Sequence, residues 1–217
     1  MIALIDYGAG NLTSVRKGFT AAGAELFTPA DPSALSGASA IVVPGVGHFG
    51  ATAALEGEWT AAIRRAAGTG TPLLGICLGM QWLFEGSEEA PGVGGLGAIP
   101  GLCTRLPRDD SGALKVPHVG WNSLHAPRGS RLLDGIEDGS QVYFTHSYAA
   151  PVSPQTVATC THGRTFAAAV EEGRIFGVQF HPEKSSDAGI RILRNFVGVV
   201  RGAEGAGIRD SRSGIRD

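Results

Sequence analysis

The sequence LLGICLGMQWLF occupies residues 73–84, and it contains the clearest fold signal in the chain. Leu73–Ile76 is a short apolar run bounded by glycine, which is typical of a buried strand. Met80–Phe84 continues as a short apolar helix after Gly79. A strand that turns almost directly into a helix indicates an α/β architecture, with Cys77 at the end of the strand.

The residues before this segment repeat the alternation of strand and helix. Ile2–Ile5 and Ala40–Val43 have the composition of buried strands, and residues 12–22 and 51–67 are predicted as helices. Asn11 is the predicted N-cap of the first helix. Strands that alternate with helices at this spacing predict a parallel sheet covered on both faces.

The second half of the chain is organised differently. Residues 91–127 are rich in Gly and Pro and are predicted as loops with short strands. Strand signals return at 142–145, 156–161, 165–170 and 175–180, and a helix is predicted over 188–200. Glu172-Gly173 is a predicted hairpin turn. We therefore expect one α/β domain over residues 1–201, with a mixed, mostly parallel sheet, followed by a polar, disordered tail over 202–217.

The composition limits the classes of partner. The chain has 217 residues, of which 43% are hydrophobic, so it can bury a sizeable core. A net charge of −2 provides no general attraction for nucleic acid. No apolar run approaches the ~18 residues of a membrane span, which predicts a cytoplasmic protein without membrane contact. Three widely spaced cysteines argue against a disulfide framework.

Cys77 lies in the motif Gly75-Ile76-Cys77-Leu78-Gly79. In hydrolases, a GxSxG segment between a strand and a helix forms a strained turn that presents the nucleophile. A thiol at a helix N-terminus also gains thiolate character. The alternative is that Cys77 is a small buried apolar residue, as most cysteines are.

A thiolate nucleophile needs a base and a group that orients the base. His181 follows the predicted strand 175–180, and Glu183 stands two residues further on. Positions i and i+2 of extended backbone point to one side, so the carboxylate can hold the imidazole. The alternative is a plain turn with an exposed His and Glu.

The loop Pro44-Gly45-Val46-Gly47 also follows a strand directly. Two glycines around one residue allow a peptide N–H to turn towards a pocket. Together with the N–H of Leu78, this loop could supply two donors to an oxyanion. The same residues could equally form an ordinary turn.

Five motifs together resemble the class I glutamine amidotransferases. They are VPGVGHF (43–49), GICLGMQ (75–81), PHVGWN (117–122), YFTHSY (143–148) and FHPEKS (180–185). VPGVGHF, GICLGMQ and FHPEKS resemble the family in general. The other two narrow the resemblance to the glutaminase subunits of imidazole glycerol phosphate synthases, over roughly residues 1–200.

The resemblance implies a role for each matching residue. It makes Cys77 the nucleophile, His181 the general base and acid, and Glu183 the residue that orients His181. Val46 and Leu78 match the oxyanion donors. The positions expected to hold the substrate glutamine are Gly47, Gln81, His146, Ser147 and Tyr148. The positions expected to face the partner subunit are Trp121, Asn122 and Lys184.

The resemblance also implies a reaction and a partner. Glutamine would be hydrolysed through a cysteine thioester, and the ammonia would pass to a (β/α)8-barrel cyclase subunit of imidazole glycerol phosphate synthase. The cyclase would form imidazole glycerol phosphate and an aminoimidazole carboxamide ribotide, in histidine biosynthesis. No metal or cofactor is expected: His118 and His125 lie seven residues apart without a third ligand. Cys103 and Cys160 are expected to be packing residues.

Two alternative functions remain at this stage. One is a binding or chaperone-like relative in which Cys77 senses redox state, although such a protein would need no contacts to glutamine. The other is a glutaminase subunit for a different pathway, such as anthranilate, carbamoyl phosphate or pyridoxal phosphate synthesis. PHVGWN and FHPEKS argue against the second alternative because they match the docking face and not only the thiol site.

Overall fold

The computed structural model describes the backbone of residues 1–108, 114–125 and 129–210. Its main feature is a seven-stranded sheet with the order β10-β11-β12-β4-β3-β1-β2. The five adjacent strands from β12 to β2 run parallel to one another. β11 is antiparallel to both of its neighbours, β12 and β10. The mixed, mostly parallel sheet predicted from the sequence is confirmed. Its strands are β1 (Ile2–Leu4), β2 (Leu26–Phe27), β3 (Ala40–Val43), β4 (Leu73–Ile76), β10 (Thr156–His162), β11 (Arg164–Glu172) and β12 (Ile175–Val178).

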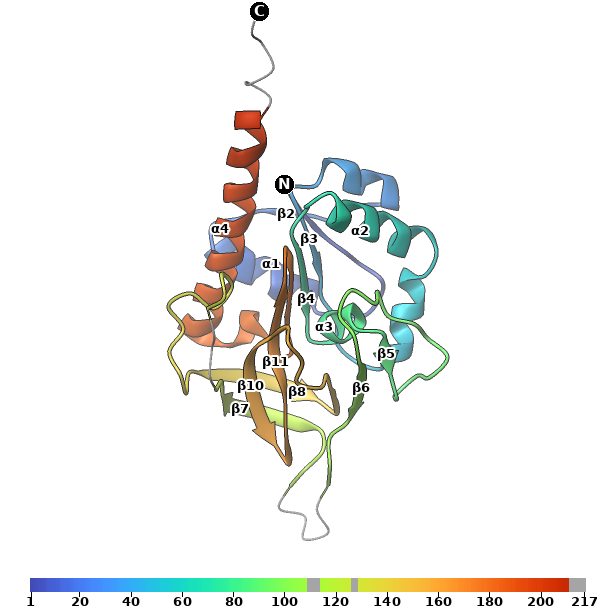
Figure 1. Cartoon of the computed structure of the whole chain (residues 1–217), viewed down its shortest axis with the longest axis vertical. Coiled ribbons are helices and arrows are strands. Elements are labelled where there is room, and N and C mark those ends of the chain that lie inside the picture. The colour runs from blue at the N-terminus through green and yellow to red at the C-terminus, as the bar shows by residue number, and fades with distance from the viewer. Residues whose placement is uncertain (109–113, 126–128, 211–217) are drawn as a thin grey trace, which may run out of the picture.

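Helices cover both faces of this sheet (Figure 1). One face packs against α1 and α4 in a core that includes Val42, Phe176 and Phe196. The other face packs against α2 and α3 in a second core that includes Ile41, Ile63 and Trp82. The helices are α1 (Leu12–Ala21), α2 (Glu58–Gly68), α3 (Leu78–Leu83) and α4 (Ser186–Asp210), with 3-10 helices η1 (Pro32–Gly37), η2 (Phe49–Leu55) and η3 (Pro182–Lys184).

The segment between α3 and β10 forms two small sheets. A three-stranded sheet contains β5 (Gly86–Ser87), β6 (Leu102–Arg105) and β9 (Tyr148–Ala149). A two-stranded antiparallel sheet pairs β7 (His118–Ser123) with β8 (Gln141–His146). The prediction of loops and short strands over 91–127 holds for the described part of that range.

Two sequence-based boundaries differ from the structure. The helix predicted over 51–67 is instead η2 followed by α2, because Gly57 adopts φ +72° between them and interrupts the helix. Residues 202–210, expected to belong to a disordered tail, are instead the last part of α4, which continues to Asp210. Residues 211–217 lie outside the described part of the chain.

The parallel strands determine where the loops meet. Since β1, β3, β4 and β12 run in one direction, their carboxyl ends lie at one edge of the sheet. Residues 5–7, 44–47, 77 and 179–181 follow these four strands and come together there. Within the described ranges, no helix has the length and apolar character required to cross a membrane.

Candidate active site

Cys77 occupies a tight turn between β4 and α3, with φ +54° and ψ −106°. A positive φ is unfavourable for a residue with a side chain, so the neighbouring backbone must hold the turn. A Cβ at Gly75 would lie 2.6 Å from the Gly79 carbonyl oxygen, and a Cβ at Gly79 would collide with the Val43 carbonyl. Both glycines of the motif are therefore required by close backbone contacts.

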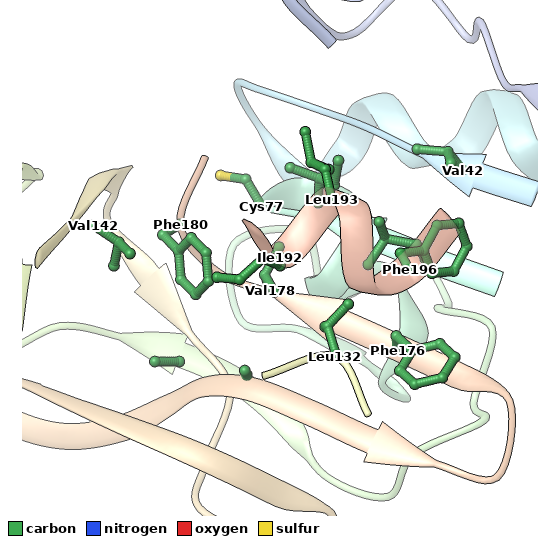
Figure 2. Close-up of a cluster of buried hydrophobic side chains, with 14 of the residues drawn as sticks. Val42, Cys77, Leu132, Val142, Phe176, Val178, Phe180, Ile192, Leu193 and Phe196 are labelled. Atoms are coloured by element: carbon green, nitrogen blue, oxygen red, sulfur yellow. The ribbon is translucent and has the colours of Figure 1, made fainter. Parts of the chain in front are cut away.

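The Cys77 sulfur points away from the core formed by α4 (Figure 2). The residue is only 3% exposed, and its backbone N–H donates to the Val178 carbonyl at 2.8 Å. The sulfur accepts a hydrogen bond from Nε2 of Gln179 at 3.6 Å and lies 3.8 Å from the Thr145 carbonyl oxygen. The thiol is thus held between β12 and β8, at the edge of the hydrophobic core.

His181 and Glu183 form a buried pair next to this thiol. Nδ1 of His181 lies 2.9 Å from Oε1 of Glu183, and both side chains are 2% exposed. The backbone is not uniformly extended as predicted: His181 is extended, whereas Glu183 lies in the 3-10 turn η3. Among the described residues, Nε2 of His181 is buried without a hydrogen-bond partner. That atom therefore remains available for proton transfer.

The surroundings of His181 favour its protonated form. Burial of the imidazole acts to lower its pKa. The Cys77 sulfur and the Glu183 carboxylate act in the opposite direction and together raise the pKa of His181 to about 10. An imidazolium beside a sulfur is the arrangement that activates a cysteine nucleophile.

A cavity of about 270 Å³ opens at Cys77. All five residues predicted to hold glutamine line it, together with both Cys77 and Leu78. The full lining is Gly47, Cys77, Leu78, Gln81, Glu89, Pro117, Thr145, His146, Ser147 and Tyr148. The structure thus brings five separate segments of the sequence to one concave site beside the thiol.

His146 and His118 have fixed proton positions. Nδ1 of His146 lies 2.8 Å from the Tyr148 carbonyl, which can only accept, so Nδ1 carries the proton. Burial lowers the pKa of His146 to about 3, so the ring is neutral and its Nε2 accepts. Nδ1 of His118, 3.1 Å away, must then donate to it. Nε2 of His118 in turn accepts from Nδ2 of Asn122 at 3.2 Å.

The same hydrogen bonds continue to the thiol. Nε2 of Gln81 donates to the Tyr148 carbonyl at 2.8 Å and to Oε1 of Gln179 at 3.1 Å. Gln179 then donates to the sulfur of Cys77. A continuous chain of hydrogen bonds therefore connects Asn122, a predicted partner-facing residue, with the sulfur of Cys77.

The two predicted oxyanion donors are not both free. The Leu78 N–H donates to the Gly45 carbonyl at 3.3 Å, so an oxyanion can use it only after this bond breaks. Val46 is 37% exposed and is not among the described residues that line the cavity. Gly47 beside it has φ +104°, a conformation that glycine adopts readily.

Two of the three predicted partner-facing residues, Trp121 and Lys184, lie on one surface. Trp121 is 51% exposed and stands on β7. Its ring packs edge-on against Tyr143 at 6.1 Å, and Nζ of Lys184 lies 5.7 Å from the centre of the Tyr143 ring. Trp121, Tyr143 and Lys184 thus form one patch. Asn122 points to the opposite face of β7, where its side chain contacts His118 and donates to the Thr161 carbonyl at 3.1 Å.

Several residues of the site had no predicted role in it, and three of them make specific contacts. Gln179 contacts the thiol, Glu89 lines the cavity and accepts from the Phe49 N–H at 2.7 Å, and His118 contacts His146. Only Gln179 had a visible signal, a polar residue at the end of an apolar strand.

Cys103 and Cys160 are buried and free, consistent with packing. Within the described residues, no group of three or more His, Cys, Asp or Glu side chains is arranged to hold a metal.

Residues 3–199 match the family described as glutamine amidotransferase class-I. The chain belongs to the class-I glutamine amidotransferase family. It is 46% identical to the imidazole glycerol phosphate synthase subunit HisH of Moorella thermoacetica, over 95% of this chain and 98% of that protein. It is 47% identical to the subunit of the same name from Methanothermobacter thermautotrophicus, over 93% of this chain and all of that protein.

Two solved structures share the fold. A crystal structure of a glutamine amidotransferase matches with a TM-score of 0.72 at 17% identity, over 93% of this chain and all of that chain. A chain of PurLQS from Thermotoga maritima matches with a TM-score of 0.70 at 18% identity, over 91% of this chain and 97% of that chain. These neighbours confirm the α/β fold expected for a class-I amidotransferase.

The geometry of the pair predicts the titration of His181. In the wild-type chain the imidazole should keep its proton as the pH rises through 6.5 and lose it near pH 10. In Cys77→Ala the pKa of His181 should fall, because the sulfur is the strongest of the contacts that raise it. An NMR titration of the His181 ring measures both values. Cys160→Ala, at a buried cysteine on β10, is the matched control and should leave the pKa unchanged. A wild-type His181 that loses its proton near pH 6.5 would contradict this account.

Proposed function

We propose that this glutamine amidotransferase hydrolyses glutamine at Cys77 and supplies the ammonia to imidazole glycerol phosphate synthesis. The observation that carries the proposal is the buried His181–Glu183 pair, 2.9 Å apart, beside a thiol that opens into a cavity lined by polar groups. The pathway is proposed from the high identity to the HisH subunits, which covers nearly the whole chain.

The chemistry starts with attack of the Cys77 thiolate on the side-chain amide carbon of glutamine. The negative charge that forms on the carbonyl oxygen is stabilised by the backbone N–H groups of Val46 and Leu78. The proton on Nε2 of His181 passes to the departing nitrogen, so that ammonia leaves and a glutamyl thioester remains. His181 then accepts a proton from water, which attacks the thioester and releases glutamate.

Glu183 orients His181 and stabilises its charge. Its carboxylate accepts the Nδ1 proton at 2.9 Å, which directs Nε2 towards the reacting atoms. The raised pKa of His181 ensures that the proton needed by the leaving nitrogen is present at neutral pH. Gln81, His146, Ser147 and Tyr148, which line the cavity, are proposed to hold the substrate glutamine together with Gly47.

The loop of residues 44–47 is proposed to switch this activity. In the present conformation the Leu78 N–H donates to the Gly45 carbonyl and is not available to an oxyanion, which leaves the oxyanion site incomplete. The loop must turn so that the Gly45 carbonyl leaves and the Val46 N–H faces the thiol. Glycine residues on both sides of Val46 allow this turn at a small steric cost. We infer that binding of the partner and its ligand favours the turned loop.

The proposed partner is a (β/α)8-barrel cyclase subunit that docks on the patch of Trp121, Tyr143 and Lys184. An exposed Trp that packs on a Tyr has the composition of an interface centre, and the charged Lys184 beside them suits its polar rim. Ammonia must pass directly to this subunit, because protonation in water would remove its nucleophilicity. The cyclase would use it to form imidazole glycerol phosphate and an aminoimidazole carboxamide ribotide.

Replacement of the nucleophile tests the proposal. In Cys77→Ala, glutamine-dependent synthesis by the complex should fall at least about a thousandfold, because no thioester can form. Synthesis from added ammonium salts should persist, since the cyclase chemistry does not need the thiol. Assays with each nitrogen source measure this difference. Cys160→Ala should retain both activities, and loss of both in Cys77→Ala would assign the thiol a structural role instead.

The switch predicts low activity of the isolated subunit. Without the cyclase, glutamine hydrolysis should be at least about a hundredfold slower than in the complex with bound ligand, because the resting loop offers neither donor and the loss of one alone lowers kcat by about that factor. Release of glutamate, measured with and without the cyclase, tests this expectation. Equal rates in the two states would exclude the loop of residues 44–47 as a switch.

The docking patch predicts a specific loss of partner binding. Trp121→Ala should weaken binding of the cyclase by about 2 kcal/mol, the size typical of a central aromatic interface residue. Leu102→Ala is the control, because Leu102 on β6 is 52% exposed and lies outside the patch. Calorimetric titration with the cyclase measures both affinities. Equal affinities of the two variants would place the interface elsewhere.

A further inference from the structure

Tyr7 has a buried hydroxyl that the proposed mechanism does not use. The residue follows β1, at the same edge of the sheet as Cys77. Among the described residues its hydroxyl oxygen is buried without a hydrogen-bond partner. A buried hydroxyl in this state has lost its hydrogen bonds to water and gained none in return. Such a group requires a physical explanation.

The hydroxyl lies against Gly45 in the loop of residues 44–47. A methyl group at Gly45 would overlap the Tyr7 hydroxyl and would also lie 2.8 Å from Cβ of Leu78. Burial, and then the charge of the Cys77 sulfur, raise the pKa of Tyr7, so the phenol keeps its proton and remains a donor. Tyr7 is not among the described residues that line the cavity, so its contact is with the loop.

The neighbouring backbone will need a donor when the loop turns. The buried Gly45 carbonyl accepts from the Leu78 N–H at 3.3 Å, a long hydrogen bond. When Leu78 is released to serve an oxyanion, this carbonyl loses its partner. A buried carbonyl without a donor is unfavourable. One conformation thus leaves a Tyr7 donor unpaired, and the other would leave a Gly45 acceptor unpaired beside it.

We propose that Tyr7 is a positioning residue for glutamine hydrolysis, whose hydroxyl donates to the Gly45 carbonyl once that carbonyl leaves the Leu78 N–H. This inference rests on the proposed function. The new hydrogen bond pairs both groups and stabilises the loop conformation in which the oxyanion donors are free. Tyr7 therefore acts through the loop and does not touch the substrate.

The test is Tyr7→Phe in the assembled complex with the cyclase and its ligand. Loss of one hydrogen bond from the active conformation should lower kcat for glutamine hydrolysis roughly tenfold. KM for glutamine should stay within about twofold, because the cavity is unchanged. The unfolding midpoint should not fall, since the hydroxyl has no partner in the resting conformation. Ammonium-dependent synthesis should be unaffected.

Thr52→Val is the matched control. Thr52 also has a buried hydroxyl, but it donates to the Phe49 carbonyl at 2.8 Å within η2. Its removal should lower the unfolding midpoint and leave kcat unchanged. The inference is overturned if Tyr7→Phe keeps full kcat, or if it loses stability as Thr52→Val does without a selective loss of kcat. A wild-type complex that releases no glutamate would instead refute the proposed function, and the inference with it.

Discussion

The site depends on the backbone contact that holds Cys77 at a positive φ between β4 and α3. Gly75 packs against the backbone of Gly79, and Gly79 packs against the Val43 carbonyl on the neighbouring strand. No side chain fits at either position without moving main-chain atoms. This close approach of β3, β4 and α3 maintains the strained turn, and the turn places Cys77 at the wall of the cavity.

The parallel sheet then supplies the other groups. Loops after β1, β3, β4 and β12 meet at one edge, so that Tyr7, Gly45, Cys77 and His181 become neighbours although they span most of the sequence. Each group arrives from a rigid strand, which fixes its position better than a long loop would. The loop of residues 44–47 is the exception, because it is short, rich in glycine and able to turn.

Neutral histidines link Asn122 on β7 to the thiol. His118 and His146 are held uncharged by burial, so each can donate from one nitrogen and accept at the other. The hydrogen bonds therefore run in one consistent direction from Asn122 to the Tyr148 carbonyl. If either ring were protonated, both of its nitrogens would be donors, and it could no longer accept the hydrogen bond from the preceding residue. The contrast with His181, which carries a proton, follows from the sulfur and carboxylate beside it.

The sequence by itself determined the α/β class and the tight turn at Cys77, because these depend on local patterns such as strand, glycine, cysteine and glycine in order. It also predicted that His181 and Glu183 would be paired. It did not reveal the break at Gly57, the full length of α4 or the contacts of His118 and Gln179. Only the tertiary structure decided which distant groups meet. It also showed that the Leu78 N–H already donates a hydrogen bond to the Gly45 carbonyl. The physical reason is that the hydrogen bonds of a buried group depend on what packs against it, and local sequence does not specify that neighbour.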